Sequence, residues 1–138
     1  MSVLSVGLST THSLAKSPTS YIYLLTNQGV QSDVHCSPTP SSNPRQVSLL
    51  DSSLLTTLSA STPLSPGSLG ENITTSNLDL TSLPLHTLLH FGDHDGHAVV
   101  RITGTREPRK RAAEWPAGLK ERGGRKQKLG VMGVVVRD

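Results

Sequence analysis

The chain has 138 residues, a formal net charge of +3 and a hydrophobic fraction of 34%. Its aromatic residues are one Phe, one Trp and two Tyr, which leaves little of the bulky surface that usually fills a core. Cys36 is the only cysteine, so an internal disulfide framework and CxxC zinc or redox motifs are excluded. These features predict a largely disordered, low-complexity chain with at most a minimal α/β element in its C-terminal half.

Charge divides the chain near residue 82. Residues 1–82 carry two basic and four acidic side chains, whereas residues 83–138 carry eleven basic and six acidic ones. The first part is rich in Ser, Thr and Pro, which favour turns and extended segments. We therefore expect a mostly disordered region over 1–82 and a basic region over 83–138.

Two weak elements are expected in the first region. A strand is expected over 21–26, because aromatic and β-branched residues lead into the turn signal Asn27-Gln28-Gly29. A helix is expected over 47–59, where leucines recur at three- and four-residue spacing. Such a stripe is typical of a core helix, and also of a partner-binding helix or a nuclear export signal.

Five Ser/Thr-Pro pairs precede residue 67. An accessible, extended pair of this kind suits a proline-directed kinase, and each phosphate would add negative charge. The candidate phosphorylation sites are Ser17, Ser37, Thr39, Thr62 and Ser65.

A short helix is expected over 83–91, since Pro84 suits a first helical turn and Gly92 a helix end. On this helix Leu85, Leu88 and Leu89 form an LxxLL pattern that resembles the coactivator box that docks into a groove of nuclear receptors. An ordinary packed helix has the same spacing.

Four histidines fall within and just after this helix, namely His86, His90, His94 and His97. Four neutral imidazoles could complete a tetrahedral zinc shell, so this spacing is geometrically compatible with a zinc site, but it matches no strong zinc motif. The alternative is a solvated turn in which Asp95-Gly96 joins the helix to the next strand, with no cofactor.

Strands are expected near 98–103 and 129–136, where β-branched runs are flanked by glycine. They could pair with one another across the basic segment between them. The second run, VMGVVV, is an aggregation hazard if it stays unpaired.

The basic segment 106–128 resembles a bipartite nuclear localisation signal, with two basic clusters on a spacer. A nuclear import receptor or another acidic protein is the partner that this resemblance implies. The same charges would also contact nucleic acid weakly and without sequence preference. The residues concerned are Lys110, Arg111, Arg122, Arg125 and Lys126.

The start of the chain lacks the basic and apolar regions of a secretory signal, and no stretch is apolar over a bilayer-spanning length. We expect no membrane association. A nuclear location is favoured, with the cytoplasm, or an organelle reached through a transit-like N-terminus, as alternatives.

No nucleophile elbow, phosphate loop or paired-carboxylate context positions the Ser, His and Asp residues, so we expect no enzyme. The sequence therefore predicts a non-enzymatic nuclear interaction or regulatory protein. The alternatives are a small metal-binding module built on the histidines and a recently arisen or alternative-frame product without an established function.

Overall fold

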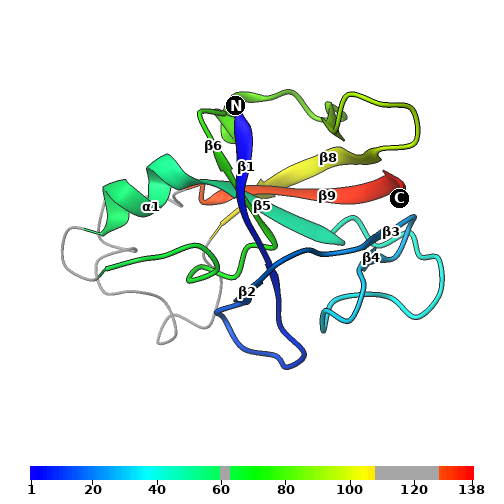
Figure 1. The fold of residues 1–138 in the computed structure, drawn as a ribbon, viewed down its shortest axis with the longest axis horizontal. Coiled ribbons are helices and arrows are strands. Elements are labelled where there is room, and N and C mark those ends of the chain that lie inside the picture. The colour runs from blue at the N-terminus through cyan, green and yellow to red at the C-terminus, as the bar shows by residue number, and fades with distance from the viewer. Residues whose placement is uncertain (60–62, 108–127) are drawn as a thin grey trace.

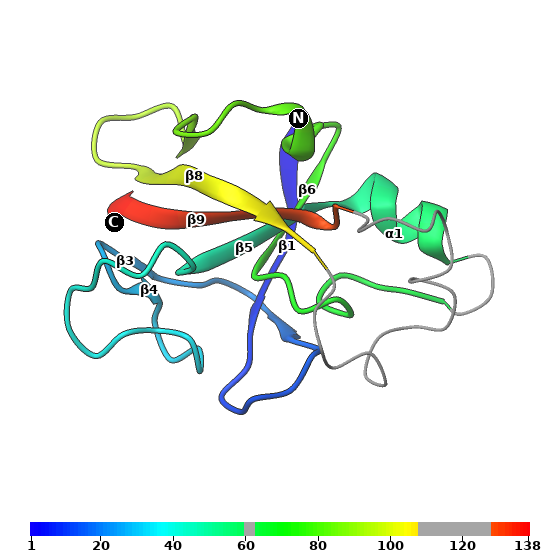
Figure 2. The same ribbon diagram turned by 180° about the vertical axis from the view of Figure 1, so that it is seen from behind.

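The computed structural model describes residues 1–59, 63–107 and 128–138, and these form a mostly-β domain. Seven strands make one mixed sheet in the order β2-β1-β6-β5-β9-β8-β7, and β3 and β4 make a separate hairpin (Figures 1 and 2). The prediction of a largely disordered chain is wrong. The elements are β1 Ser2–Leu8, β2 Ser17–Thr19, β3 Leu24–Leu25, β4 Gly29–Val30, β5 Val47–Asp51, α1 Ser52–Leu58, β6 Ile73–Ser76, a 3-10 turn η1 Leu80–Ser82, β7 Leu88–Phe91, β8 Ala98–Arg106 and β9 Gly130–Arg137.

Ser and Thr occupy strand positions, which explains why composition gave the wrong fold class. Strand β1 pairs antiparallel with β6, so that Val6 lies opposite Ile73, far away in the sequence. Thr74 and Thr75 of β6 are buried, and threonine is β-branched and fits a pleated surface. A segment that looks like a polar linker is therefore an inner strand of the sheet.

The expected helix over 47–59 is a helix only in its second half. Residues 47–51 form β5, which pairs with β6 in parallel and with β9 in antiparallel orientation. A parallel pair needs a crossover connection, and α1 lies in it. Asp51 ends the strand and caps the helix, since its carboxylate accepts a hydrogen bond from Ser53 N at 3.2 Å.

The expected helix over 83–91 is wrong. Residues 88–91 form β7, which pairs antiparallel with β8 from Leu88 opposite Arg101 to Phe91 opposite Ala98. His86 has a φ of 71°, which a right-handed helix does not allow. The leucine spacing indicated a helix, but the backbone N–H and C=O groups of this segment form their hydrogen bonds with β8 instead.

Strands occur where they were expected near 98–103 and 129–136, as β8 and β9, and they pair with each other. Strand β9 also pairs with β5, so both of its edges are covered and its apolar run is not free to aggregate. Gly130 is required here, because a Cβ on it would lie 2.1 Å from the Leu49 carbonyl oxygen.

The strand expected over 21–26 is shorter in the structure. Only Leu24 and Leu25 pair, with Val30 and Gly29, around a turn in which Asn27 has a φ of 57°. Leu24 and Val30 of this hairpin are buried in the main core.

The sheet has a core on each face. Leu49 of β5 lies in the main core with Ile73, Val100 and Val131, whereas Leu50 points to the other face. On that face α1 contributes Leu55 and Leu58 to a second cluster with Leu50. Strand β1 crosses the direction of β5, β8 and β9 steeply in both views, so the sheet is strongly twisted around the main core (Figures 1 and 2).

Within the described residues, no helix is long and apolar enough to cross a membrane.

Candidate functional site

A buried ion pair lies where the loops after β1 and β4 meet. Lys16 Nζ lies 2.8 Å from Asp33 Oδ2, and the side chains are only 5% and 2% exposed. Asp33 also accepts hydrogen bonds from the backbone N–H groups of Ser9 and His35, each at 3.0 Å. Burial raises the pKa of Asp33, but the hydrogen bonds from Lys16, His35 and Ser9 outweigh it and the net pKa is lowered. Asp33 is therefore an anion at neutral pH.

Asn72 connects this ion pair to the sheet. Its Nδ2 donates to Asp33 Oδ2 at 3.2 Å and to the Gly7 carbonyl oxygen at 3.1 Å. Its Oδ1 accepts from Ser48 N at 3.2 Å. Asn72, directly before β6, thus fixes β1, β5 and the loop after β4 relative to one another.

Glu71 lies beside Asn72 and is 1% exposed. Its Oε1 accepts from Gly67 N at 2.7 Å and from Thr74 Oγ1 at 3.0 Å, whereas its Oε2 has no hydrogen-bond partner within the described part of the chain. Arg106, at the end of β8, interacts electrostatically with Glu71. Burial lowers the pKa of Arg106, and the negative charge of Glu71 opposes this effect. The Arg106 guanidinium reaches Gly70, since a Cβ there would lie 3.0 Å from Nη2.

Two histidines lie next to these charges. The rings of His12 and His35 are 5.7 Å apart between centroids, at an interplanar angle of 70°. Burial lowers the pKa of His35, and the positive charges of Lys16, His12 and Arg106 lower it further against the opposing effect of Asp33. His35 is therefore a neutral imidazole at pH 7 that stands close to several cationic groups.

We call these seven residues the polar site. Its members are His12, Lys16, Asp33, His35, Glu71, Asn72 and Arg106. It holds backbone and side-chain donors, two buried carboxylates and an arginine, which together suit a polar ligand that carries both an anionic group and N–H donors.

The four candidate zinc ligands lie outside the polar site, and only two of them bring their rings together. His90 Nδ1 and His97 Nε2 are 2.7 Å apart, and His97 Nδ1 contacts the His94 carbonyl oxygen. The His94 imidazole pairs with Asp93 instead, and His86 lies in the turn before β7. Among the described residues, no three His, Cys, Asp or Glu side chains are grouped so that they could hold a metal ion.

The LxxLL residues do not share a helical face. Leu85 and Leu88 are 59% and 49% exposed, and Leu89 packs against the main core. Because Leu88 and Leu89 are neighbours on a strand, their side chains point to opposite faces. The three-leucine face that groove docking requires is absent.

Of the phosphorylation candidates, Ser17, Thr39 and Ser65 are exposed, and Ser37 is half-buried with its hydroxyl donating to the Thr39 carbonyl oxygen. Phosphorylation of these residues stays a prediction. Thr62 and all five basic targeting residues, Lys110, Arg111, Arg122, Arg125 and Lys126, lie outside the described residues.

No sequence pattern predicted the polar site. Its members come from five separate stretches of sequence, and no short motif joins them. One signal was available: only six charged residues occur in 1–82, and three of them, Lys16, Asp33 and Glu71, are buried here. A buried charge needs a partner to offset its desolvation. When a region with few charges folds, its buried charged residues therefore indicate a polar network.

Solved structures of bacterial proteins share this fold. The YuaD protein from Bacillus subtilis superposes with a TM-score of 0.71 at 17% identity, over 98% of this chain and 87% of that one. YiiM from Escherichia coli gives 0.67 at 16% identity, over 99% of this chain and 63% of that one. YiiM from Geobacillus stearothermophilus gives 0.65 at 16% identity, over 99% and 68%. No curated protein matches the chain.

Residues 31–137 match the MOSC domain family, and the chain belongs to this family. MOSC domains are associated with binding of the molybdenum cofactor. The predicted nuclear interaction or regulatory protein is wrong, because a folded MOSC domain occupies most of the chain. Family membership likewise overturns the alternatives of a histidine-based metal module and of a recently arisen or alternative-frame product. The cellular location of the protein stays a prediction.

Proposed function

We propose that this protein binds the molybdenum cofactor at the polar site and does so without sulfur chemistry of its own. The proposal is supported by the family association and by one structural observation. That observation is a buried carboxylate, Glu71, which interacts with Arg106 and has one oxygen without a hydrogen-bond partner among the described residues. The imidazole pair His12–His35 stands within electrostatic reach of Arg106.

The chemistry of the cofactor fits these residues. The cofactor is a pterin that carries a phosphate and a dithiolate, and it supplies a redox-active molybdenum centre when bound. An arginine and imidazole N–H groups are donors suited to the phosphate, because charge-assisted hydrogen bonds to phosphate are strong. The aminopyrimidine part of a pterin presents N–H donors, and Glu71 Oε2 is an acceptor to which no described residue donates.

The state of Cys36 favours binding over sulfur transfer. Cys36 is the only thiol in the chain, and its Sγ donates to the Ser37 carbonyl oxygen at 3.6 Å. Burial raises the pKa of this thiol and the nearby Asp33 carboxylate raises it further. The nucleophile in sulfur transfer is a thiolate, so a thiol kept protonated at pH 7 is poorly suited to it. The non-enzymatic character expected from the sequence is part of this proposal.

The test is retention of cofactor by purified protein. Anaerobic cofactor, released from a molybdoenzyme, is mixed with the protein, and the mixture is separated by gel filtration. Molybdenum is quantified by mass spectrometry and the oxidised pterin by its fluorescence. We expect the wild type to retain both, and His12→Gln and His35→Gln each to weaken retention by about fivefold, the scale of one lost hydrogen bond.

Matched controls separate the roles of the residues. His86→Gln changes an exposed histidine outside the polar site and should retain cofactor as the wild type does. Cys36→Ser should also retain it, because no thiol ligation is proposed. The proposal is wrong if the wild type retains no cofactor, or if the two site variants retain as much as His86→Gln.

A further inference from the structure

A cavity lies between strand β1 and strand β7, away from the polar site. Its volume is about 830 Å³, and it is lined by residues of β1, of the 19–25 segment and of β6 to β8. Strand β7 is one end of the sheet order and β1 lies next to the other end, so the twist of the sheet brings both strands to one cavity. No residue of the polar site is among those that line it.

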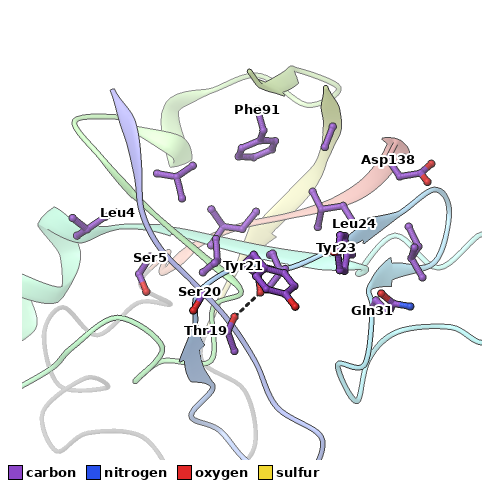
Figure 3. A pocket seen from close by; sticks show the side chains of 16 residues that line it. Leu4, Ser5, Thr19, Ser20, Tyr21, Tyr23, Leu24, Gln31, Phe91 and Asp138 are labelled. Carbon is purple, nitrogen blue, oxygen red and sulfur yellow. Dashed lines mark hydrogen bonds between the residues drawn. The ribbon is translucent and has the colours of Figure 1, made fainter. Parts of the chain in front are cut away.

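Aromatic rings stand on two sides of this cavity. Tyr21 and Tyr23 form an edge-to-face pair with centroids 5.2 Å apart, and they are 66% and 60% exposed. Phe91 of β7 lies across the cavity from them (Figure 3). The tyrosine segment is held in place by Thr19 Oγ1, which donates to the Tyr21 carbonyl oxygen at 2.8 Å, and by Gln31 N, which donates to the Tyr23 carbonyl oxygen at 2.9 Å.

Exposed apolar side chains concentrate at the same place. Val3 and Leu4 of β1 line the cavity and are 45% and 57% exposed, while buried Leu24 and Ile73 also contribute to its lining. Solvent-exposed aliphatic and aromatic side chains in a concave site are stabilised when a ligand covers them. A volume near 800 Å³ is in the range of pockets for small molecules.

The charge of the lining selects the kind of ligand. Among the described residues that line the cavity, Asp138 is the only charged one, and Lys, Arg and His are absent. The Asp138 carboxylate accepts a hydrogen bond from the Thr26 hydroxyl, which lowers its pKa and keeps it ionised. A ligand with a phosphate or a carboxylate would meet no positive charge in this lining. An amino-substituted or cationic ring would meet the negative charge of Asp138.

We propose that this cavity binds a flat, amino-substituted heteroaromatic molecule that is neutral or cationic and lacks an anionic group. The ring lies between Phe91 and the tyrosine pair, and its amino group faces Asp138. This site is separate from the polar site and does not depend on the function proposed there.

Proflavine, a planar diamino-substituted cation with intrinsic fluorescence, is the probe. Anthracene-9-carboxylate, a flat three-ring anion, is its charge-reversed counterpart. We expect proflavine to bind with saturable fluorescence changes and the anion to bind at least about tenfold more weakly, since tenfold corresponds to the loss of one charge-assisted contact. Amide shifts in a ¹H–¹⁵N spectrum should map to the lining residues.

The variants use exposed side chains, so that the fold is kept. Tyr21→Ala and Tyr23→Ala should each weaken proflavine binding by about fivefold, the scale of one aromatic contact. Leu4→Ala should weaken it, whereas Leu85→Ala, which removes a leucine of nearly equal exposure outside the cavity, should not. Asp138→Asn should reduce the preference for proflavine over the anion.

Three results would overturn the proposal: no binding of proflavine to the wild type, equal binding of the anion, or indifference of binding to Leu4→Ala and the tyrosine variants. Sedimentation without ligand gives a further check. A dimer that Leu4→Ala converts to a monomer, with Leu85→Ala unchanged, would show that a second copy of the chain covers this cavity instead of a small molecule.

Discussion

Removal of the positive charge from the buried Lys16–Asp33 pair is predicted to be strongly destabilising. In Lys16→Met the Asp33 carboxylate, 2% exposed, keeps its hydrogen bonds from Ser9, His35 and Asn72 but loses its only ion-pair partner among the described residues. Loss of one partner of a buried pair costs about 3–5 kcal/mol, because the remaining charge stays desolvated. With an m-value of about 2 kcal/mol/M, the urea midpoint should fall by about 2 M.

The assay is urea unfolding followed by far-UV circular dichroism at pH 7. Lys128→Met, which removes an exposed lysine, is the control and should change stability by less than about 0.5 kcal/mol. Lys16→Arg keeps the charge and serves as a milder variant if Lys16→Met does not fold. In the double variant Lys16→Met/Asp33→Asn both charges are gone, so its loss should be smaller than the sum of the single losses by at least about 1 kcal/mol.

The pH dependence gives an independent check. The pKa of Asp33 is lowered in the folded protein, so its stabilisation is present above the unfolded value of 3.8 and is lost as pH falls through the lower folded pKa. In Lys16→Met the lysine no longer opposes the effect of burial on the pKa of Asp33, so that pKa is higher than in the wild type. The loss of stability on acidification should therefore begin at higher pH. A Lys16→Met variant that is within about 1 kcal/mol of the wild type, with an unchanged acid profile, would refute the reasoning.

Three further predictions concern the core, the close approach of strands and the charge state of the polar site. Leu49→Ala should cost about 2–5 kcal/mol in urea unfolding, since this residue is 1% exposed in the main core, whereas Leu4→Ala should stay near the wild type. Gly130→Ala should destabilise by at least about 2 kcal/mol, because its Cβ would overlap the backbone of β5; wild-type stability would contradict the close approach of β9. Binding of inorganic phosphate to the polar site, measured by titration calorimetry, should tighten as pH falls from 7 through the lowered pKa of His35, because His35 is neutral at pH 7 and an anion favours its protonated form. His35→Gln should flatten that profile, and an unchanged slope would exclude His35 from the site.

Some of the fold could be read from local sequence. The runs 98–103 and 129–136 combine β-branched residues with flanking glycines, and strands β8 and β9 lie there. The turn signals at Asn27-Gln28-Gly29 and Asp95-Gly96 also fall at the turns of the β3–β4 and β7–β8 hairpins. These signals depend on the conformational preferences of a few neighbouring residues, so they survive without knowledge of the rest of the chain.

Other elements could not be read locally. Leucines at helical spacing occur both in 47–59 and in 83–91, yet Val47–Asp51 and Leu88–Phe91 are strands. In each case a neighbouring strand, β6 and β9 for the first and β8 for the second, supplies the hydrogen bonds that decide the conformation. Propensity is a weak prior, and tertiary pairing overrides it.

The sequence by itself determined the scarcity of charge and aromatic residues, the single thiol and the two β-branched strands of the C-terminal half. Only the tertiary structure decided that Ser/Thr-rich segments are inner strands and that Lys16, Asp33, Glu71 and Arg106 meet at one site. The physical reason is that strand pairing and ion pairing join groups that lie far apart in the sequence. A local sequence pattern does not indicate which distant segment its residues will pair with.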